Sequence, residues 1–104
     1  MPARNNLGLS LIVGGFYDEA IATLTPIANV SPRVRANLAL AHGIAGDMGQ
    51  ATRLLRADYD DEGTSRQLVY FGQLRTLSIA ERAASLRNNS HYFPRPSAPR
   101  RPAP

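Results

Sequence analysis

The segment GGFYDEAIATL, residues 14–24, has a pattern that returns 31 residues later as AGDMGQATRLL, residues 45–55. In each copy a glycine, Gly15 or Gly46, comes five residues before an alanine and nine residues before a leucine. A fixed period of this length is typical of helical solenoids, in which each unit is a pair of helices that stacks on the next. The sequence therefore predicts an all-α protein made of stacked helical hairpins.

Local signals mark where the predicted helices begin and end. Gly15 is expected to end the first helix, because glycine adopts the left-handed conformation at a helix C-terminus without steric cost. Ser31, with a proline directly after it, is expected to cap and begin the second hairpin. Asp47 and Gln50 have the spacing of a capping box. Pro26 predicts that the second helix kinks or ends close to it.

These signals divide the chain into a helical domain over residues 5–87 and a tail over residues 88–104. Within the domain we expect a first repeat over 5–32, a second over 33–58, and a closing helix or helices over 60–87. The tail contains five prolines and three arginines but no acidic residue. Such a composition cannot bury a core, which predicts a disordered Pro/Arg-rich tail.

Composition excludes several classes of function. Twelve arginines against eight acidic residues give a net charge of +4, but the tail supplies three of those arginines and no acid. The body is therefore close to neutral, which argues against specific nucleic-acid binding. No apolar run reaches the length of a transmembrane helix. The apolar stretch near the N-terminus is interrupted by Ser10 and two glycines, so it makes no convincing signal peptide and the default location is cytoplasmic.

No catalytic, metal-binding or cofactor-binding arrangement is expected. His42 and His91 are the only histidines, and the chain has no cysteine. A general base needs an oriented partner and a nucleophile within reach, and His42 lies in an apolar helical pattern that predicts packing between helices. The acidic residues 60–62 are explained by helix capping. We therefore expect a protein that is not an enzyme and uses no cofactor.

The segment NLGLSLIVGGFYDEAIATLTPIANVSP, residues 6–32, resembles the tetratricopeptide repeat (TPR) family. The residues at the family's signature positions are Leu7, Gly8, Gly15, Tyr17, Ala20, Leu24 and Pro32. The resemblance implies a TPR-like hairpin solenoid of about two repeats plus a closing helix. It also implies a non-catalytic scaffold that binds a protein or peptide partner along a concave groove.

The family's concave groove is lined by the first helix of each repeat. The resemblance assigns the following residues to it: Asn5, Leu9, Ile12, Ala36, Leu40, Gly43, Arg66, Tyr70 and Gln73. The alternative is that Leu9 and Leu40 face a neighbouring helix as part of the core, since spacing alone does not separate the two roles.

A narrower resemblance lies in SPRVRANLALAHGIAGDMGQATRLLRADYDDE, residues 31–62, followed by LVYFGQLRTL, residues 68–77. These segments are similar to the C-terminal part of TadD-type TPR proteins of the Tad (Flp) pilus assembly system. The resemblance implies a role in pilus or secretion assembly and a location in the cell envelope. The lipid-accepting cysteine usual in that family is missing here.

Two other functions remain open. The first repeat has no preceding helix to cover Leu7, Leu11 and Phe16, so the chain could be a structural TPR fragment that forms a homodimer through its N-terminal repeat. A weaker alternative is a regulatory module associated with an enzyme.

Overall fold

The computed structural model describes residues 2–88, and this part of the chain is built from helices. The helices are α1 (Pro2–Val13), α2 (Tyr17–Leu24), α3 (Pro32–Ala45), α4 (Met48–Arg56), α5 (Asp61–Arg75) and α6 (Ile79–Asn88). A single turn of 3-10 helix, Thr25–Ile27, follows α2. The prediction of an all-α protein is thus confirmed. The predicted tail lies outside the described residues except for Asn88, which ends α6.

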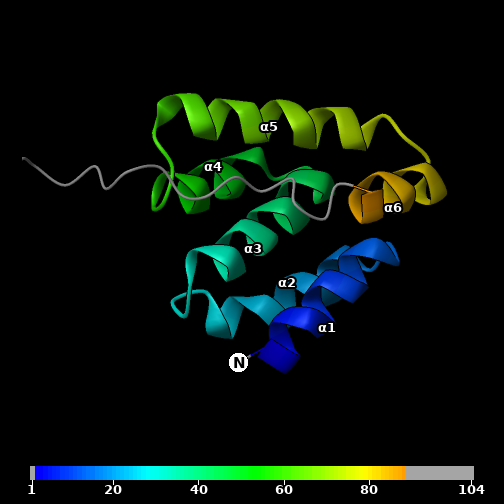
Figure 1. Cartoon of the computed structure of the whole chain (residues 1–104), viewed down its shortest axis with the longest axis horizontal. Helices are drawn as coiled ribbons and strands as arrows, with labels where there is room; N and C mark the ends of the chain where they lie inside the picture. Colours follow the sequence, from blue (N-terminus) through cyan, green and yellow to red (C-terminus); the bar gives the residue numbers. More distant parts are fainter. Residues whose placement is uncertain (1, 89–104) are drawn as a thin grey trace, which may run out of the picture.

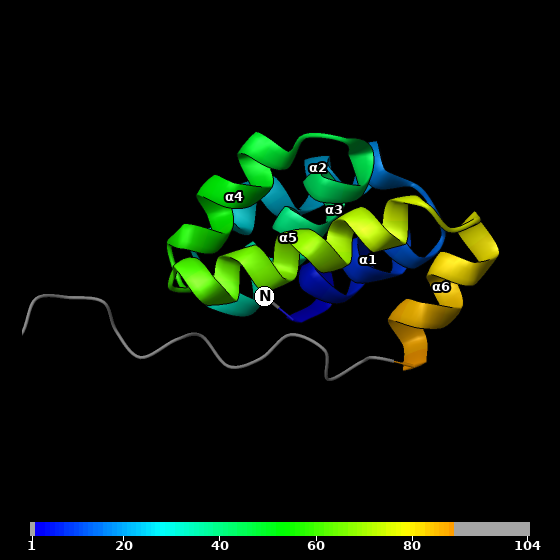
Figure 2. The ribbon, with the colours of Figure 1, turned by 90° about the horizontal axis from the view of Figure 1, so that it is seen from above.

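The first four helices form two hairpins that lie side by side (Figure 1). Helix α1 pairs with α2, α3 pairs with α4, and α2 packs against α3 to join the two hairpins. Helix α5 then packs against both α3 and α4. Seen from above, α2 and α4 lie on one side of α1, α3 and α5, whereas α6 runs out onto the other side (Figure 2).

The helix ends follow the predicted signals. Gly15 and Gly46 come after α1 and α3 with φ angles of +87° and +105°, a conformation that side chains with a Cβ rarely adopt. The Ser31 hydroxyl accepts a hydrogen bond from the backbone N–H of Val34 at 3.2 Å and so caps α3. Pro26 lies in the 3-10 turn directly after α2, as its position predicted.

The repeated alanine and leucine positions form the centre of the core. Ala20 and Ala51 are fully buried, with no exposed surface, and Leu24 and Leu55 are buried beside them. A small side chain at this point of α2 and α4 lets each helix lie close to its hairpin partner. The 31-residue period therefore has a physical basis in the two hairpins.

One ion pair closes the second hairpin. Arg35, near the start of α3, donates from Nε and Nη2 to the two carboxylate oxygens of Asp58, just after α4, each at 2.7 Å. Its Nη1 also donates to the carbonyl of Ala28 at 3.1 Å. The two-pronged hydrogen bond to Asp58 raises the pKa of Arg35, partial burial of the guanidinium lowers it in part, and the charge of Asp58 raises it further. Sequence analysis did not identify this pair.

Candidate functional site

The residues assigned to the binding face lie on three neighbouring helices. Helix α1 carries Asn5, Leu9 and Ile12, α3 carries Ala36, Leu40 and Gly43, and α5 carries Arg66, Tyr70 and Gln73. Helix α3 packs against both α1 and α5, so the three sets belong to one part of the molecule. We call the side of α1, α3 and α5 that faces away from α2 and α4 the open face (Figure 2).

Four of these residues are buried. Ile12, Ala36 and Leu40 belong to the hydrophobic core, and Gly43 is buried as well. Gly43 is the point of closest approach between α3 and α5: a Cβ there would lie 2.6 Å from the ring of Phe71. For Leu40, the structure matches the alternative in which this leucine faces neighbouring helices. These four residues are therefore part of the packed interior and are not available to a partner.

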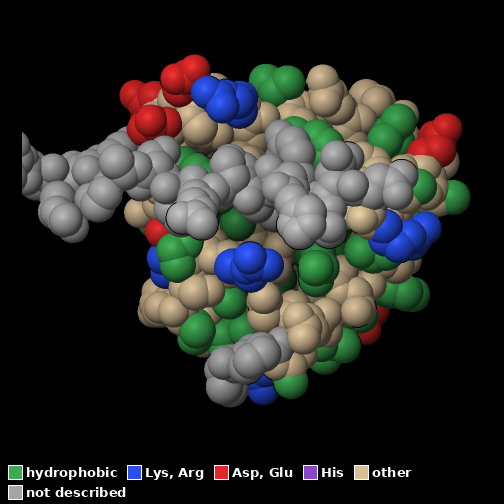
Figure 3. All heavy atoms as spheres, in the orientation of Figure 1, with side chains coloured by type: hydrophobic (Ala, Val, Ile, Leu, Met, Phe, Trp, Pro, Cys, Tyr) green, Lys and Arg blue, Asp and Glu red, His purple; other side chains and the backbone are tan. Residues whose placement is uncertain are grey.

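The other five residues are accessible to different degrees. Leu9 is 38% exposed, Arg66 and Gln73 are exposed, and Asn5 and Tyr70 are half-buried. Acidic side chains gather at the N-terminal end of α5 (Figure 3), where Arg66 pairs with Glu62 at 2.8 Å. Both members of this pair are well exposed, so it contributes little to stability.

A side-chain hydrogen bond joins two helices behind the open face. The amide nitrogen of Asn37 donates to the side-chain oxygen of Asn5 at 3.0 Å and links α3 to α1. Asn37 is buried in the core, where its amide needs a partner. Its signal in the sequence is a lone amide among the apolar residues of α3, which the 31-residue alignment matches with Asn6 and not with Asn5.

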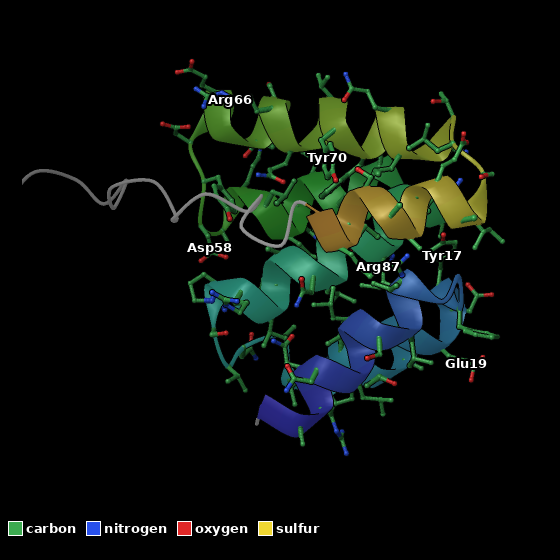
Figure 4. All side chains as sticks on the ribbon, turned by 45° about the vertical axis from the view of Figure 1, so that its right-hand side comes forward. Tyr17, Glu19, Asp58, Arg66, Tyr70 and Arg87 are labelled. Carbon is green, nitrogen blue, oxygen red and sulfur yellow. The ribbon has the colours of Figure 1, made fainter. Side chains whose placement is uncertain are left out.

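The chain itself covers part of the open face with α6. In Figure 1 this helix lies to the right of α3, between α5 and α1, and it packs against α5 and α1. Tyr70 projects from α5 toward α6 (Figure 4), and its hydroxyl lies 3.1 Å from the hydroxyl of Ser85. At the other end of the contact, the Ile79 side chain lies over Gly15. A residue predicted to contact a partner thus contacts the chain's own last described helix.

Arg82 makes the densest set of polar contacts between α6 and the rest of the domain. Its guanidinium donates to the backbone carbonyls of Leu74 at 2.8 Å, Leu77 at 2.9 Å and Arg75 at 3.3 Å. It also donates to the Tyr17 hydroxyl at 2.6 Å and lies 5.6 Å from the centre of that ring. Carbonyls at the C-terminus of a helix lack intrahelical partners, so Arg82 caps α5 while it holds α6.

Arg82 stands at the repeat position that two buried alanines occupy in α2 and α4. Helices α2, α4 and α6 begin at residues 17, 48 and 79, so each starts 31 residues after the one before. The fourth residue of each helix is Ala20, Ala51 or Arg82. The two alanines are buried where α2 and α4 lie against α1 and α3, and an arginine does not fit such a close contact. We attribute the path of α6 across α1 to this side chain. Sequence analysis missed it because residues 79–87 were not aligned with the second helix of a repeat.

His42 and Glu81 both have pKa values below their ordinary ones. Burial lowers the pKa of His42, the charge of Asp47 raises it in part, and Arg53 lowers it further. In α6, hydrogen bonds from Ser78 lower the pKa of Glu81. These two residues form a reciprocal capping box, with Ser78 N–H donating to the Glu81 carboxylate at 2.9 Å and Glu81 N–H to the Ser78 hydroxyl at 3.1 Å.

The described residues were also searched for a metal-binding cluster and for a membrane-spanning helix. Within residues 2–88, no three His, Asp or Glu side chains are grouped so that they could hold a metal ion. None of the helices in that range has the length and apolar character needed to cross a bilayer. Comparison of the chain with protein-family models, with curated proteins and with solved structures found no match.

Proposed function

We propose that this protein is a non-catalytic scaffold that binds a helical segment of a partner protein on the open face. The observation that carries the proposal is the position of α6, a helix seated on this face against α1 and α5. A surface that accepts a helix of its own chain has a shape that suits a helix from another chain. Leu9 supplies an accessible apolar anchor on α1, and Tyr70 supplies a hydrogen-bonding group on α5.

We further infer that the two hairpins are repeats of the TPR type. The inference rests on the resemblance of residues 6–32 to that family and on the equivalent roles of Gly15 with Gly46 and of Ala20 with Ala51. A role in Tad/Flp pilus or secretion assembly, with a location in the cell envelope, rests on the sequence resemblance to TadD-type proteins alone.

The test begins with helical peptides selected for binding from a displayed library. Their affinity is then measured for the wild type, for Leu9→Glu, and for the control Val30→Glu, which changes an exposed apolar residue in the turn before α3. We expect Leu9→Glu to weaken binding by at least about tenfold, which corresponds to about 1.4 kcal/mol, and Val30→Glu to leave it nearly unchanged. Circular dichroism checks that both variants are folded. Equal losses in both variants, or none in either, would count against the open face.

A second candidate function is self-association, favoured by a comparison of two leucines. Leu38 on α3 is 3% exposed, and Leu7, its counterpart 31 residues earlier on α1, is 53% exposed. Helix α3 has α2 of the preceding hairpin packed against it, whereas no described helix stands in the same relation to α1. A second copy of the chain would bury Leu7 and the equally exposed Phe16.

Light scattering after size-exclusion chromatography, over a series of concentrations, tests this candidate. Self-association predicts a mass that rises with concentration in the wild type and in Leu9→Glu, and a constant monomer mass in Leu7→Glu. A wild-type chain that stays monomeric at every concentration would exclude it.

A further inference from the structure

Helix α6 lies on the open face, which is also the proposed binding site of the partner helix, so the two helices compete for one surface. We propose that α6 is an intramolecular occupant of the open face, held by Arg82, and that a partner helix binds only after α6 has left. The inference rests on the proposed function and adds its regulation. Three features of the described residues support it.

The first feature is the small apolar contact that α6 makes. Among residues 79–87, Ala83 alone is buried, at 8% exposure, and Ile79 at the start of the helix is largely exposed. By contrast, α4 buries Ala51 and Leu55 almost completely. Because the hydrophobic contribution scales with the buried apolar area, α6 is held much less firmly than α4. An element with few buried contacts opens without unfolding the rest of a domain.

The second feature is that much of the attachment of α6 to the domain consists of polar contacts. Arg82 joins α6 to the C-terminal carbonyls of α5 and to Tyr17, and Tyr70 joins it through Ser85. Leu74 is the only buried residue among those whose carbonyls accept a hydrogen bond from Arg82, and the Arg82 contacts lie at a partly exposed end of the helix pair. Water can therefore replace Arg82 at these acceptors when α6 leaves, so that departure leaves few polar groups unsatisfied.

The third feature is the connection of α6 to the domain. The turn between α5 and α6 spans residues 76–78, and α6 is the last of the described helices. Rotation about this turn would move α6 off α1 without changing the packing between the two hairpins. Helix α4 has no such freedom, because it lies between α3 and α5 in the chain and packs against both.

The contacts of α6 also define the chemistry of the partner. The helix offers a small residue, Ala83, at its most buried point, a hydroxyl at Ser85, and an aliphatic anchor at Leu86 that packs against the core. A competing helix would present the same three kinds of group at the same spacing, together with a cation to replace Arg82 at the end of α5.

The experiment compares the full-length wild type with Arg82→Ala and with the control Arg87→Ala, which alters an exposed arginine of the same helix. The first readout is hydrogen exchange of the backbone amides. We expect α6 amides to exchange at least about tenfold faster in Arg82→Ala, with α3 amides unchanged, and Arg87→Ala to resemble the wild type. The second readout is binding of a fluorescent synthetic peptide with the sequence of residues 76–88. It should bind Arg82→Ala at least about tenfold more tightly than it binds the wild type.

Three outcomes would overturn the inference. Unchanged exchange of α6 would mean that Arg82 does not hold the helix. Faster exchange of α6 and α3 together would mean that α6 leaves only on global unfolding. Faster exchange of α6 with no gain in peptide binding would mean that the vacated surface is no helix site.

A second variant guards against misfolding of Arg82→Ala. Ser85→Ala removes the α6 side of the contact with the Tyr70 hydroxyl and leaves Tyr70 available to the peptide, and we expect it to shift both readouts in the same direction by about two- to threefold. Peptides selected for the proposed function separate the two ideas. If they bind wild type and Arg82→Ala equally well at the open face, the scaffold function stands and the occupancy of that face by α6 does not.

Discussion

Helices α4 and α6 begin alike and end in different places. Each begins one residue after a capping side chain, Asp47 or Ser78, that accepts a hydrogen bond from a backbone N–H three residues later. Helix α4 then folds back along α3 and enters the core, whereas α6 crosses to α1 and stays near the surface (Figure 1). Similar caps thus begin both helices, and the difference in packing goes with a different side chain at the fourth position, Ala51 in α4 and Arg82 in α6.

The largest effect is expected when α4 receives the side chain that α6 carries at the same repeat position. Ala51→Arg would place a large cation in a contact that leaves Ala51 no exposed surface. We expect the free energy of unfolding to fall by about 3–5 kcal/mol, enough to unfold much of the population. Urea denaturation followed by circular dichroism measures the change. Ala57→Arg, at an exposed position just after α4, is the control and should change stability by no more than about 0.5 kcal/mol. Similar losses in both variants would show that the contact at Ala51 is not special.

A second prediction compares Gly43, which lies in a close contact between helices, with Gly72, which has open space around it. Gly43→Ala would bring a Cβ to 2.6 Å from the Phe71 ring and should destabilise the protein by about 1–3 kcal/mol. Gly72→Ala, in α5, meets no heavy atom within 4 Å and should stabilise it by about 0.5–1 kcal/mol through helix propensity. Thermal or urea unfolding of the two variants gives both values. The opposite signs are the prediction, and a gain in both would mean that Phe71 moves aside without cost.

Much of the fold follows from the sequence because its signals are local. Glycine at a helix end, serine or aspartate at a helix start, and the repeated alanine each act within a few residues of where they stand. Gly46, Ser31 and Asp47 accordingly have the roles that their types predict. The separate helix α6 was left open although a local signal marks its start: Ser78 and Glu81 have the spacing of a capping box, which the sequence analysis did not use.

The candidate site was harder to predict because it depends on contacts between distant segments. Spacing placed Leu9 and Leu40 in equivalent positions, yet Leu40 is buried by neighbours on more sides than Leu9. Arg82 contacts Tyr17, which lies 65 residues earlier in the chain. No periodicity reveals such a contact, although the replacement of a repeated alanine by arginine is a visible signal that something changes there.

The smallest expected effect is a difference in how the contributions of the second hairpin and of α6 to stability depend on pH. Burial lowers the pKa of His42 below its ordinary value of 6.5, so the unfolded chain binds a proton more readily. The stability linked to the neutral form of His42 is therefore fully present above pH 6.5 and is lost as the pH falls through the lowered pKa. In α6, the pKa of Glu81 lies below its ordinary 4.5, so the capping box contributes above pH 4.5 and is lost only at lower pH.

The free energy of unfolding, measured in urea across this pH range, should therefore fall in two pH windows as the pH is lowered. The first fall comes from His42 in the second hairpin and the second from Glu81 in α6. His42→Gln should abolish the first decline and Glu81→Gln the second. His91→Gln, outside the described residues, is the control for the first. If that control removed the decline below pH 6.5 while His42→Gln kept it, burial of His42 would not be its cause.

Hydrogen exchange measured below pH 4.5 tests the second window separately, because protonation of Glu81 should speed exchange in α6 and leave α3 unchanged. A change of the same size in both helices would mean that α4 and α6 are held by one cooperative unit, and the contrast between them would then be one of path alone.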